Sequence, residues 1–393
     1  MEQLTLLTEE QVRAVQQEFG TPIFVYDERT LQKQAADVLS FPHAYGFQAR
    51  YSMKGCPTAS VIRLFHDLGL HIDASSVYEA ERAMRAGVPP EHIQITAQEL
   101  PRNLGEWLDK GFRFNLTSLH QLREYGRLRP GTPVSVRINP GRGSGHNQRT
   151  NVGGRSASFG IWHEHLDQLF DVQRAFGLRI TGMHTHIGSG ADPQIWHRCA
   201  RLSLRIASRL PEVETLNLGG GFKVARVFGE SGADLKAIGE LIKRDFEAFY
   251  AEHGRKLKLE IEPGTYLVAN AAVLICTVID VVDTGPQGYR FIKIDAGMTE
   301  ITRPSLYGAQ HPIVIVPSKH DQRGIGEYVV VGHCCESGDL LTPKPGNPER
   351  LSPRTLTEPR VGDALVIGGA GAYCSAMCVK NYNSFPEAPE VLL

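Results

Sequence analysis

The sequence predicts an α/β protein, in which a (β/α)8 TIM-type barrel is followed by a mostly antiparallel β domain. From residue 27 to about residue 265, short apolar runs alternate with helix-like stretches, and eight such alternations are typical of a closed barrel. Beyond residue 265, β-branched runs are separated by Pro and Gly, which indicates antiparallel strands. The 393 residues also exceed the ~250–300 at which a single core stops growing. An open doubly wound sheet is the main alternative to the barrel.

The chain begins with a short predicted helix. Thr8 and Gln11 have the spacing of a capping box, and Gly20 occupies the position of a C-cap. The run Pro22–Tyr26 (PIFVY) is typical of a short strand, which we assign to the β-rich domain. The predicted domains are therefore residues 27–265 for the barrel, and residues 1–26 plus 266–393 for the β-rich domain.

The remaining elements follow from the spacing of apolar residues. The eight predicted barrel strands are Ala49–Ser52, Leu70–Asp73, Ile93–Thr96, Phe114–Leu116, Val134–Ile138, Ile180–His186, Thr215–Leu218 and Lys258–Ile261. Ser76–Ala86 and Ile238–Glu252 are predicted amphipathic helices between them. The predicted strands of the β-rich domain are Val273–Val282, Phe291–Asp295, Ile313–Val316, Tyr328–Gly332 and Ala364–Ile367.

The composition excludes several classes of protein. Lys plus Arg number 42 and Asp plus Glu number 43, so the basic excess of a nucleic-acid binder is missing. No apolar run approaches the ~18 residues that a membrane span needs. The first residues, MEQLTLLTEEQV, do not have the basic start and apolar core of a signal peptide. Seven cysteines without a CxxC pair then favour a reduced, cytoplasmic setting.

Polar residues interrupt the apolar pattern where the predicted barrel strands end. In a (β/α)8 barrel these carboxyl ends converge on one mouth, where catalytic groups lie. The residues at these ends are Lys54, Asp73, Thr96, Asn115, Asn139, His186, Gly219–Gly221 and Glu262.

Three of these positions suggest the chemistry of a bound organic cofactor. Lys54 could form a Schiff base, although an ordinary strand-end lysine is the alternative. Gly219–Gly221 could bring backbone N–H groups close to a phosphate, or could simply form a tight turn. Glu262 could pair with a protonated ring nitrogen, or could be a surface carboxylate before a Pro-Gly turn. Neither GRGSGH nor GGAGAY completes GxGxxG, so a dinucleotide site is disfavoured.

Histidines and cysteines suggest other roles. His184 and His186 share one face of a strand and could bind a metal ion, for which Asp73 is the available third ligand. Packing or stacking on a ring is the favoured alternative. In HCCESGD, a cysteine in a polar loop could transfer a proton, whereas a buried thiol would be part of the core. Cys374 and Cys378 are predicted to be core residues.

The motifs together resemble those of the fold-type III pyridoxal-phosphate (PLP) decarboxylases, and most closely those of the diaminopimelate decarboxylases. The resemblance extends from GTPIFVYD to YNSFPEAPEVLL, and its motifs occur in the order of that family. They are YSMKG, RINPG, HTHIGSG, LNLGGGF, EIEPG, DAGMTEITRPSLYGAQH, HCCESGD and GAYCSAM. The pair CESGD and GAY is the more specific part, since alanine racemases share the barrel and the cofactor lysine but lack this pair.

The resemblance implies a PLP cofactor, an alanine racemase-like fold and a role for each matching residue. Lys54 matches the lysine that holds PLP, His186 the histidine stacked on its ring, and Glu262 the partner of its pyridine nitrogen. Cys335 matches the proton donor. The residues that match cofactor contacts also include Ser189, Gly219, Gly220, Gly221, Gly264 and Tyr373. The residues that match substrate contacts are Arg303, Tyr307, Glu336 and Tyr373. The family further implies a head-to-tail homodimer in which the CESGD loop reaches the mouth of the neighbouring barrel.

Three departures from the family bear on the substrate. Thr265 stands where the family usually has arginine after EPG, Phe385 replaces the arginine of YNSRP, and the chain ends at Leu393 where relatives usually continue. The leading hypothesis is decarboxylation of meso-diaminopimelate to L-lysine and CO2. The alternatives are the same chemistry on a related amino acid in a specialised pathway, a non-catalytic PLP-binding homologue, and a metal-dependent barrel hydrolase.

Overall fold

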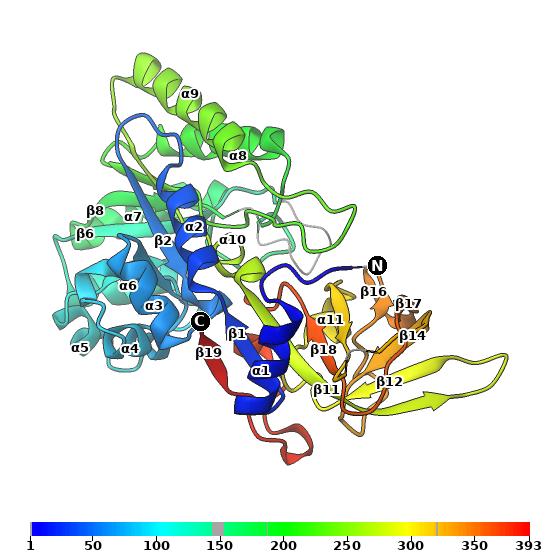
Figure 1. The fold of residues 1–393 in the computed structure, drawn as a ribbon. Helices are drawn as coiled ribbons and strands as arrows, with labels where there is room; N and C mark the ends of the chain where they lie inside the picture. The colour runs from blue at the N-terminus through cyan, green and yellow to red at the C-terminus, as the bar shows by residue number, and fades with distance from the viewer. Residues whose placement is uncertain (1, 144–152, 187, 320) are drawn as a thin grey trace. The chain divides into compact units, whose positions relative to one another are not determined.

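The chain folds into two compact units, seen in a computed structural model that describes residues 2–143, 153–186, 188–319 and 321–393 (Figure 1). One unit, the barrel unit, comprises Gln32–Val224 and Ser231–Leu267. The other, the β-rich unit, comprises Met1–Leu31, Ala225–Glu230 and Val268–Leu393.

The barrel unit is built on a closed sheet of eight parallel strands. Their order is β5-β4-β3-β2-β10-β9-β8-β6, and β6 pairs with β5 to close the ring. Closure confirms the predicted (β/α)8 barrel and excludes the open doubly wound sheet. The strands are β2 (Phe47–Ser52), β3 (His71–Ala74), β4 (Ile93–Ile95), β5 (Arg113–Leu116), β6 (Pro133–Asn139), β8 (Arg179–His184), β9 (Thr215–Asn217) and β10 (Lys258–Ile261). A short extra strand, β7 (Ile161–Trp162), pairs with β6.

Helices connect the barrel strands and cover the outside of the sheet. They are α2 (Glu28–Leu39), α3 (Ala59–Asp67), α4 (Val77–Arg85), α5 (Leu104–Asp109), α6 (Leu119–Leu128), α7 (Leu166–Phe176), α8 (Pro193–Ala207), α9 (Leu235–His253) and the short α10 (Thr265–Val268). Single turns of 3-10 helix occur at η1 (Met53–Gly55), η2 (Pro90–His92) and η4 (His163–His165). Helices α8 and α9 lie side by side (Figure 1). Within the described ranges, no helix combines the length and apolar character required to cross a membrane.

The β-rich unit contains a mostly antiparallel sheet, as the Pro- and Gly-punctuated sequence predicts. Its strand order is β13-β18-β11-β12-β14-β17, and β1 pairs with both β11 and β19. The strands are β1 (Ile23–Tyr26), β11 (Ala272–Asp283), β12 (Arg290–Ile294), β13 (Ile313–Val316), β14 (Ile325–Val331), β17 (Arg354–Thr357), β18 (Ala364–Ile367) and β19 (Glu390–Leu392), with the separate pair β15 (Pro343–Lys344) and β16 (Asn347–Leu351). The α-helices of this unit are α1 (Glu9–Phe19) and α11 (Arg303–Tyr307). Its 3-10 turns are η5 (Ala269–Ala271), η6 (Ser375–Met377) and η7 (Tyr382–Ser384).

Helix α1 begins and ends where the sequence predicts. The Thr8 Oγ1 accepts the backbone N–H of Gln11 at 3.2 Å, and the Gln11 side chain accepts that of Thr8 at 2.8 Å. This reciprocal capping box satisfies two backbone donors of the first turn. Val12 and Val15 then pack against β1, β11 and β18 in the core of the β-rich unit.

Several strand bounds differ from the predicted ones by one to three residues, and the difference at β8 affects a predicted site residue. The sequence predicts a strand over Ile180–His186, but β8 ends at His184. The neighbouring strand β9 ends at Asn217, and Thr185 donates its N–H to the Asn217 carbonyl. His186 therefore lies beyond the last residue that the neighbouring strand can pair with.

Three histidines pack together near the amino ends of β3 and β4. The His66 Nε2 and the His92 Nδ1 are 3.0 Å apart, and the His71 ring stacks on that of His92 with centroids 4.1 Å apart. Burial, followed by the positive charges of Arg50, His92, Arg113 and Lys258, lowers the pKa of His71 to about 3. Its Nδ1 is buried and has no hydrogen-bond partner among the described residues.

We expect His71 to make the fold sensitive to acid. Because its folded pKa is lower than the unfolded value of about 6.5, the unfolded chain binds more protons below pH 6.5, and stability falls as the pH drops. Between pH 7 and pH 5 the loss should be about 1–2 kcal/mol, allowing for solvent screening. Urea unfolding at the two pH values measures this loss, which should shrink in His71→Asn and persist in a control variant of the exposed His120, His120→Asn. An unchanged loss in His71→Asn would contradict the assignment.

Candidate active site

The carboxyl ends of the barrel strands carry the residues that the sequence places at the mouth. Lys54 lies in η1, directly after β2, and its side chain is exposed. Asp73 lies in β3, and Glu262 immediately follows β10. Because the strands are parallel and form a closed ring, these ends meet at one rim.

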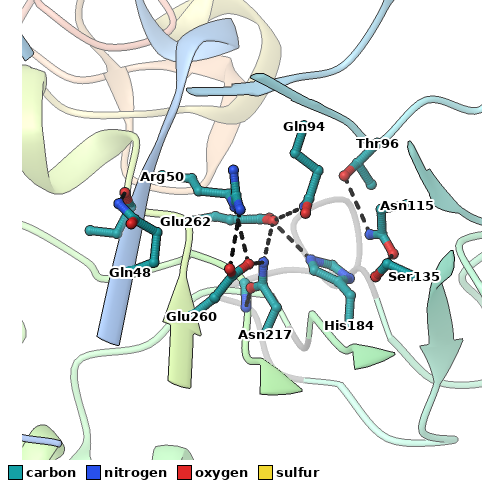
Figure 2. Close-up of polar contacts among 12 residues, drawn as sticks. Gln48, Arg50, Gln94, Thr96, Asn115, Ser135, His184, Asn217, Glu260 and Glu262 are labelled. Atoms are coloured by element: carbon teal, nitrogen blue, oxygen red, sulfur yellow. Dashed lines mark hydrogen bonds and ion pairs between the residues drawn. The ribbon is translucent and has the colours of Figure 1, made fainter. Parts of the chain in front are cut away.

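Glu262 is the centre of a buried hydrogen-bond network (Figure 2). Its Oε1 accepts from the Nδ2 of Asn217 at 2.7 Å and from the Nε2 of Gln94 at 3.0 Å. Its Oε2 accepts from the Nε2 of His184 at 3.0 Å. Glu262 is 6% exposed and His184 is 1% exposed. Three donors from three different strands therefore fix the orientation of one buried carboxylate.

This network keeps Glu262 ionised. Burial alone would raise the pKa of Glu262, but the hydrogen-bonded His184 and then the charge of Lys54 outweigh it and lower the pKa to about 2. Burial also lowers the pKa of His184, which favours a neutral imidazole whose Nε2–H faces Glu262. Glu262 is thus an anion over the whole physiological range of pH.

The pKa of Asp73, the second carboxyl at this rim, is shifted in the opposite direction to that of Glu262. Its Oδ2 accepts from the Ser52 hydroxyl at 3.1 Å, and its Oδ1 is buried without a partner in the described part of the chain. Burial, and then the negative charge of Glu262, raise the pKa of Asp73 to about 8, although Lys54 acts in the other direction. At neutral pH one carboxyl of this coupled pair is therefore charged and the other holds a proton.

A buried ion pair is formed by Glu260, two residues before Glu262. Glu260 points to the same side of β10 as Glu262, and it accepts from the Arg50 Nε at 3.0 Å and from its Nη2 at 3.1 Å (Figure 2). Both side chains are almost completely buried. The Asn217 Nδ2 also approaches the Glu260 Oε2 at 3.5 Å, so Asn217 connects the two carboxylates.

The glycine loop after β9 is packed too closely for side chains. A Cβ on Gly219 would lie 2.6 Å from the His186 Nδ1, one on Gly220 2.1 Å from the Glu262 carbonyl oxygen, and one on Gly221 1.7 Å from the Gly188 carbonyl oxygen. Ser189 lies in the opposing turn, where Gly190 bridges to Phe222. The structure therefore brings Gly219–Gly221, His186 and Ser189 close together. Gly264 precedes α10, and its carbonyl accepts the N–H of Leu267.

Two other strand-end residues, Asn115 and Asn139, make hydrogen bonds to neighbouring strands and to the backbone. Asn115 donates to the Thr96 Oγ1 at 3.3 Å and accepts from Ser135 at 3.0 Å, which connects three neighbouring strands (Figure 2). Asn139 accepts the N–H groups of Gly141 and Gly154 through its Oδ1. The Asn139 side chain thus holds the backbone of Gly141, Gly154 and Ala157.

His184 is already engaged in the hydrogen-bond network of Glu262. The ring centroids of His184 and His186 are 6.5 Å apart, and their planes are inclined by 54°. Across the residues that the structure describes, no three His, Cys, Asp or Glu side chains are grouped to hold a metal ion.

The β-rich unit holds the predicted proton donor in a fixed loop. Cys335 is exposed, and its backbone N–H donates to the Asn383 Oδ1 at 2.8 Å. Asp339 accepts the N–H of Cys334 at 2.9 Å, and Glu336 accepts that of Gly338 at 3.0 Å. The loop is therefore held by side chains on both sides of Cys335.

Phe385 has a defined place beside this loop. Its ring stacks on that of His333 with centroids 3.6 Å apart and planes inclined by 6°. His333 is two residues before Cys335. Phe385, at the position where the resemblance leads one to expect arginine, therefore packs beside the loop that carries Cys335.

The other predicted substrate contacts lie elsewhere in the β-rich unit. Arg303 begins α11 and Tyr307 ends it, and the Arg303 Nε donates to the His311 Nε2 at 3.3 Å. Tyr373 adopts a left-handed backbone conformation with φ +57°, which is uncommon for a residue with a side chain. Among the core predictions, Cys374 is buried, whereas Cys378 is only half-buried.

Sequence reasoning missed several members of the network around Glu262. Gln94, Arg50 and Glu260 lie within strands, and Asn217 is the last residue of β9. A signal was present, because each is a polar residue within an otherwise apolar parallel strand, where both faces are normally buried. Arg137 has the same signature, with an Nη2 that is buried and without a partner among the described residues.

Comparison with known proteins agrees with this geometry. The family model for the pyridoxal-dependent decarboxylase, pyridoxal binding domain, matches residues 30–269. The chain is 34% identical to diaminopimelate decarboxylase of Escherichia coli K12, over 99% of this chain and 92% of the relative. It is 35% identical to that of Streptomyces coelicolor, over 96% of this chain and 85% of the relative.

Solved structures of such enzymes have the same fold. A crystal structure of diaminopimelate decarboxylase superposes with a TM-score of 0.91 and 34% identity, covering 99% of this chain and 92% of that one. Diaminopimelate decarboxylase from Helicobacter pylori complexed with L-lysine gives a TM-score of 0.84 at 26% identity, covering 97% of this chain and 93% of that one. Matches of this length, joined to a barrel rim with Lys54, His186 and Glu262, show that the chain belongs to the family of pyridoxal-dependent decarboxylases.

Proposed function

We propose that this enzyme decarboxylates meso-diaminopimelate to L-lysine and CO2, the last step of a route of lysine biosynthesis. The observation that carries the proposal is the ionised, buried Glu262 near the charge of Lys54, in a chain that matches diaminopimelate decarboxylases along nearly its whole length. The related enzyme from Helicobacter pylori was crystallised with L-lysine, the expected product.

The residues at the rim fit pyridoxal phosphate. The Glu262 carboxylate has accepted three hydrogen bonds, and a carboxylate can accept about four, so Oε2 keeps room for one more donor. The His186 Nδ1 is buried without a partner among the described residues, and the Gly219–Gly221 backbone has no room for side chains. A planar ring with a protonated nitrogen suits Glu262, and a phosphate suits the glycine loop with Ser189.

Each residue of this chain then has a role in the reaction. The bound cofactor supplies an electron sink for the pair left on the former α-carbon after CO2 leaves. Lys54 would hold the cofactor through its aldehyde group. Glu262 would keep the ring nitrogen protonated, and its own orientation is fixed by His184, Asn217 and Gln94. We propose that the Cys335 thiol returns a proton to the former α-carbon.

A carbon-dioxide release assay with added pyridoxal phosphate tests the reaction and its substrate. The panel contains meso-diaminopimelate, lysine, ornithine and arginine at equal concentrations. We expect kcat/KM to be highest for meso-diaminopimelate. Thr265, in place of the arginine that the resemblance leads one to expect, is the specific observation that favours a related amino acid instead. A preference for ornithine or arginine would support that second candidate, and no CO2 from any member of the panel would refute the proposal.

Cys335→Ala is expected to keep the bound cofactor and to lower kcat by about 10²–10⁴, the usual contribution of a positioned acid. The thiol lies on a loop whose backbone is fixed by Asn383 and Asp339, so removing it should not disturb the loop. Cys378→Ala, at a half-buried thiol of the same unit, is the control and should keep full activity. Full activity of Cys335→Ala would remove the proton-donor role.

We further propose a homodimer with shared active sites and a cytoplasmic setting. The exposure of Cys335 and the family resemblance support the homodimer. The cysteine content of the chain supports the cytoplasmic setting. If each site combines Lys54 from one protomer with Cys335 from its partner, mixing inactive Lys54→Ala and Cys335→Ala subunits should restore up to about a quarter of the activity, because half of the random dimers are mixed and each has one intact site. No recovery after subunit exchange would place both residues in the same protomer.

A further inference from the structure

Residues 333–339, which we call the cysteine loop, carry the proposed proton donor Cys335 in the β-rich unit. Two backbone amides of the loop are held by side chains: Cys334 donates its N–H to the Asp339 Oδ2 at 2.9 Å, and Cys335 donates to the Asn383 Oδ1 at 2.8 Å. Cys335 is exposed, whereas Cys334 and Asp339 are buried. The Cys335 thiol is therefore presented by a loop whose orientation depends on its buried neighbours.

A buried carboxyl with no assigned part in the reaction lies against this loop. Glu300 is 1% exposed, and its Oε2 lies 3.6 Å from the His333 Nε2 at the start of the loop. Oε2 accepts the N–H of Gly297 at 2.9 Å and the hydroxyl of Thr299 at 2.7 Å. Oε1 is buried and has no hydrogen-bond partner among the described residues. Burying an unsatisfied polar atom costs stability, so the place of this carboxyl calls for an explanation.

The Thr299 hydroxyl connects the carboxyl to the loop. Thr299 is 6% exposed, and its Oγ1 lies 2.7 Å from both the Glu300 Oε2 and the His333 Nε2. A hydroxyl has one proton to donate, so when it donates to an ionised Glu300 it accepts from the His333 Nε2–H. If Oε2 carries a proton instead, both bonds reverse and the hydroxyl donates to Nε2. The protonation of Glu300 therefore determines which tautomer of His333 fits.

His333 is held through both its side chain and its backbone. Its ring stacks on that of Phe385 with centroids 3.6 Å apart, and its side chain is 9% exposed. Its backbone N–H donates to the Ala296 carbonyl at 3.1 Å. Because Cys335 follows only two residues later, a reorientation of the imidazole would shift the backbone that carries the thiol.

The surroundings of Glu300 favour its protonated form. Burial raises the pKa of Glu300 to about 7; the hydrogen bonds that it accepts oppose this shift, and the negative charges of Asp339 and Asp295 add to it. Burial also lowers the pKa of His333, against the effect of the same two aspartates. The intact cluster therefore accommodates the neutral forms of Glu300 and His333 best.

Thiols also face Glu300. Cys276 lies in β11, Cys334 in the cysteine loop and Cys378 directly after η6. Burial raises the pKa of each of them. These three thiols therefore add no charge to the cluster at neutral pH.

We propose that Glu300 is a positioning residue: joined to His333 through the Thr299 hydroxyl, its carboxyl holds the cysteine loop in the arrangement from which Cys335 delivers its proton. The inference rests on the proposed function and deepens it, because it assigns the support of the proton donor to a chain of three side chains. This chain acts on the thiol through the backbone of the loop. Its loss should therefore lower kcat and leave KM nearly unchanged.

Thr299→Val removes the connecting hydroxyl and keeps the shape of the side chain. We expect kcat for meso-diaminopimelate to fall by about 10-fold, because a small displacement of a reacting group has an effect of this size, with KM changed by less than about twofold. The matched control is Thr355→Val on β17, where the hydroxyl also bonds a glutamate, Glu327, but at the surface. The control should keep the rate of the wild type. Equal losses in the two variants, or a raised KM with unchanged kcat, would overturn the inference.

A double-mutant cycle separates positioning of the thiol from general damage to the fold. In the Cys335→Ala background, Thr299→Val should lower kcat by less than about a further twofold, because the loop no longer carries the donor that it positions. Independent losses, which multiply in the double variant, overturn the inference.

Hydrogen exchange of the loop amides tests the role of the Glu300 proton without reference to catalysis. When the loop opens and water reaches Glu300, its pKa returns to the ordinary value of about 4.3, below the value of about 7 in the intact cluster. The open form then binds fewer protons, so protection of the Cys335 amide should fall by about 10-fold or more from pH 5 to pH 7, after correction for the intrinsic rate. Glu300→Gln keeps the shape but does not titrate, and should show no such fall. Protection that does not change with pH in the wild type, or an equal fall in Glu300→Gln, overturns the inference.

The exchange experiment also distinguishes this inference from the proposed function. If the wild-type enzyme releases no CO2 from any substrate of the panel, the proposed function fails. Exchange in Thr299→Val then decides the inference alone: faster exchange confined to the cysteine loop, with β11 and β12 as protected as in Thr355→Val, supports the positioning role. Equal exchange in the two variants, or faster exchange in the strands as well as in the loop, overturns it.

Discussion

Lys54→Ala is expected to abolish the visible absorbance of the bound cofactor and to lower the decarboxylation rate by ~10³-fold or more, since the change removes the proposed attachment point of the cofactor. Lys54 lies at the rim directly after β2, and its charge lowers the pKa of both Asp73 and Glu262, in each case against burial. Without it, the two carboxyls have no neighbouring ammonium. Absorbance spectra of the purified variant and the carbon-dioxide assay measure the two losses.

Matched variants separate a chemical from a structural loss. Lys33→Ala, at an exposed lysine of α2, should keep both spectrum and rate. Small primary amines added to Lys54→Ala should restore part of the rate, because they can replace the missing amino group. A variant that keeps the absorbance of the wild type would show that another residue holds the cofactor.

Glu262→Gln is expected to lower kcat by about 10²–10⁴ while the cofactor remains attached to Lys54. Glutamine has nearly the same shape, but it carries no charge to keep a ring nitrogen protonated. It also turns one acceptor into a donor among Asn217, Gln94 and His184, so one buried polar group loses its bond at a cost of about 1–3 kcal/mol. Single-turnover kinetics measures the chemical step, and urea unfolding measures the stability.

Asp73→Asn is the comparison that makes the Glu262 prediction specific. Both carboxyls lie at the same rim, but burial and Glu262 raise the pKa of Asp73 to about 8, so at pH 7 this substitution removes little charge. The loss of kcat should therefore be much smaller than for Glu262→Gln. Because the pKa of Glu262 is held near 2, the wild-type rate should also show no acid limb from this carboxylate between pH 5 and pH 8. Equal losses in the two variants would reverse the assignment of charge.

The barrel could be predicted because its strands satisfy a local rule. Buried parallel strands are short apolar runs, and β10 and β18 have the predicted bounds, Lys258–Ile261 and Ala364–Ile367. Strand ends are less certain, because they depend on the neighbouring strand: β8 stops at His184 because β9 stops at Asn217. Local sequence does not contain that information.

The site could be predicted only in part, for a related reason. Lys54, His186 and Glu262 interrupt apolar runs at strand ends and carry reactive groups, so they are visible in the sequence. Gln94 and Asn217 act only through the carboxylate they hold, and that contact joins positions 168 and 45 residues apart.

The pair formed by Arg50 and Glu260 has a consequence for how such enzymes can diverge. Removing one member of a buried ion pair typically costs 3–5 kcal/mol, a large share of the stability of a domain, whereas exchanging both for apolar residues is often neutral. A substitution at either position alone is therefore strongly destabilising, whereas a paired substitution at both positions can be tolerated. Among descendants of a common ancestor, substitutions at these two sites should be inherited together, and a lineage that has lost the arginine should have lost the glutamate as well.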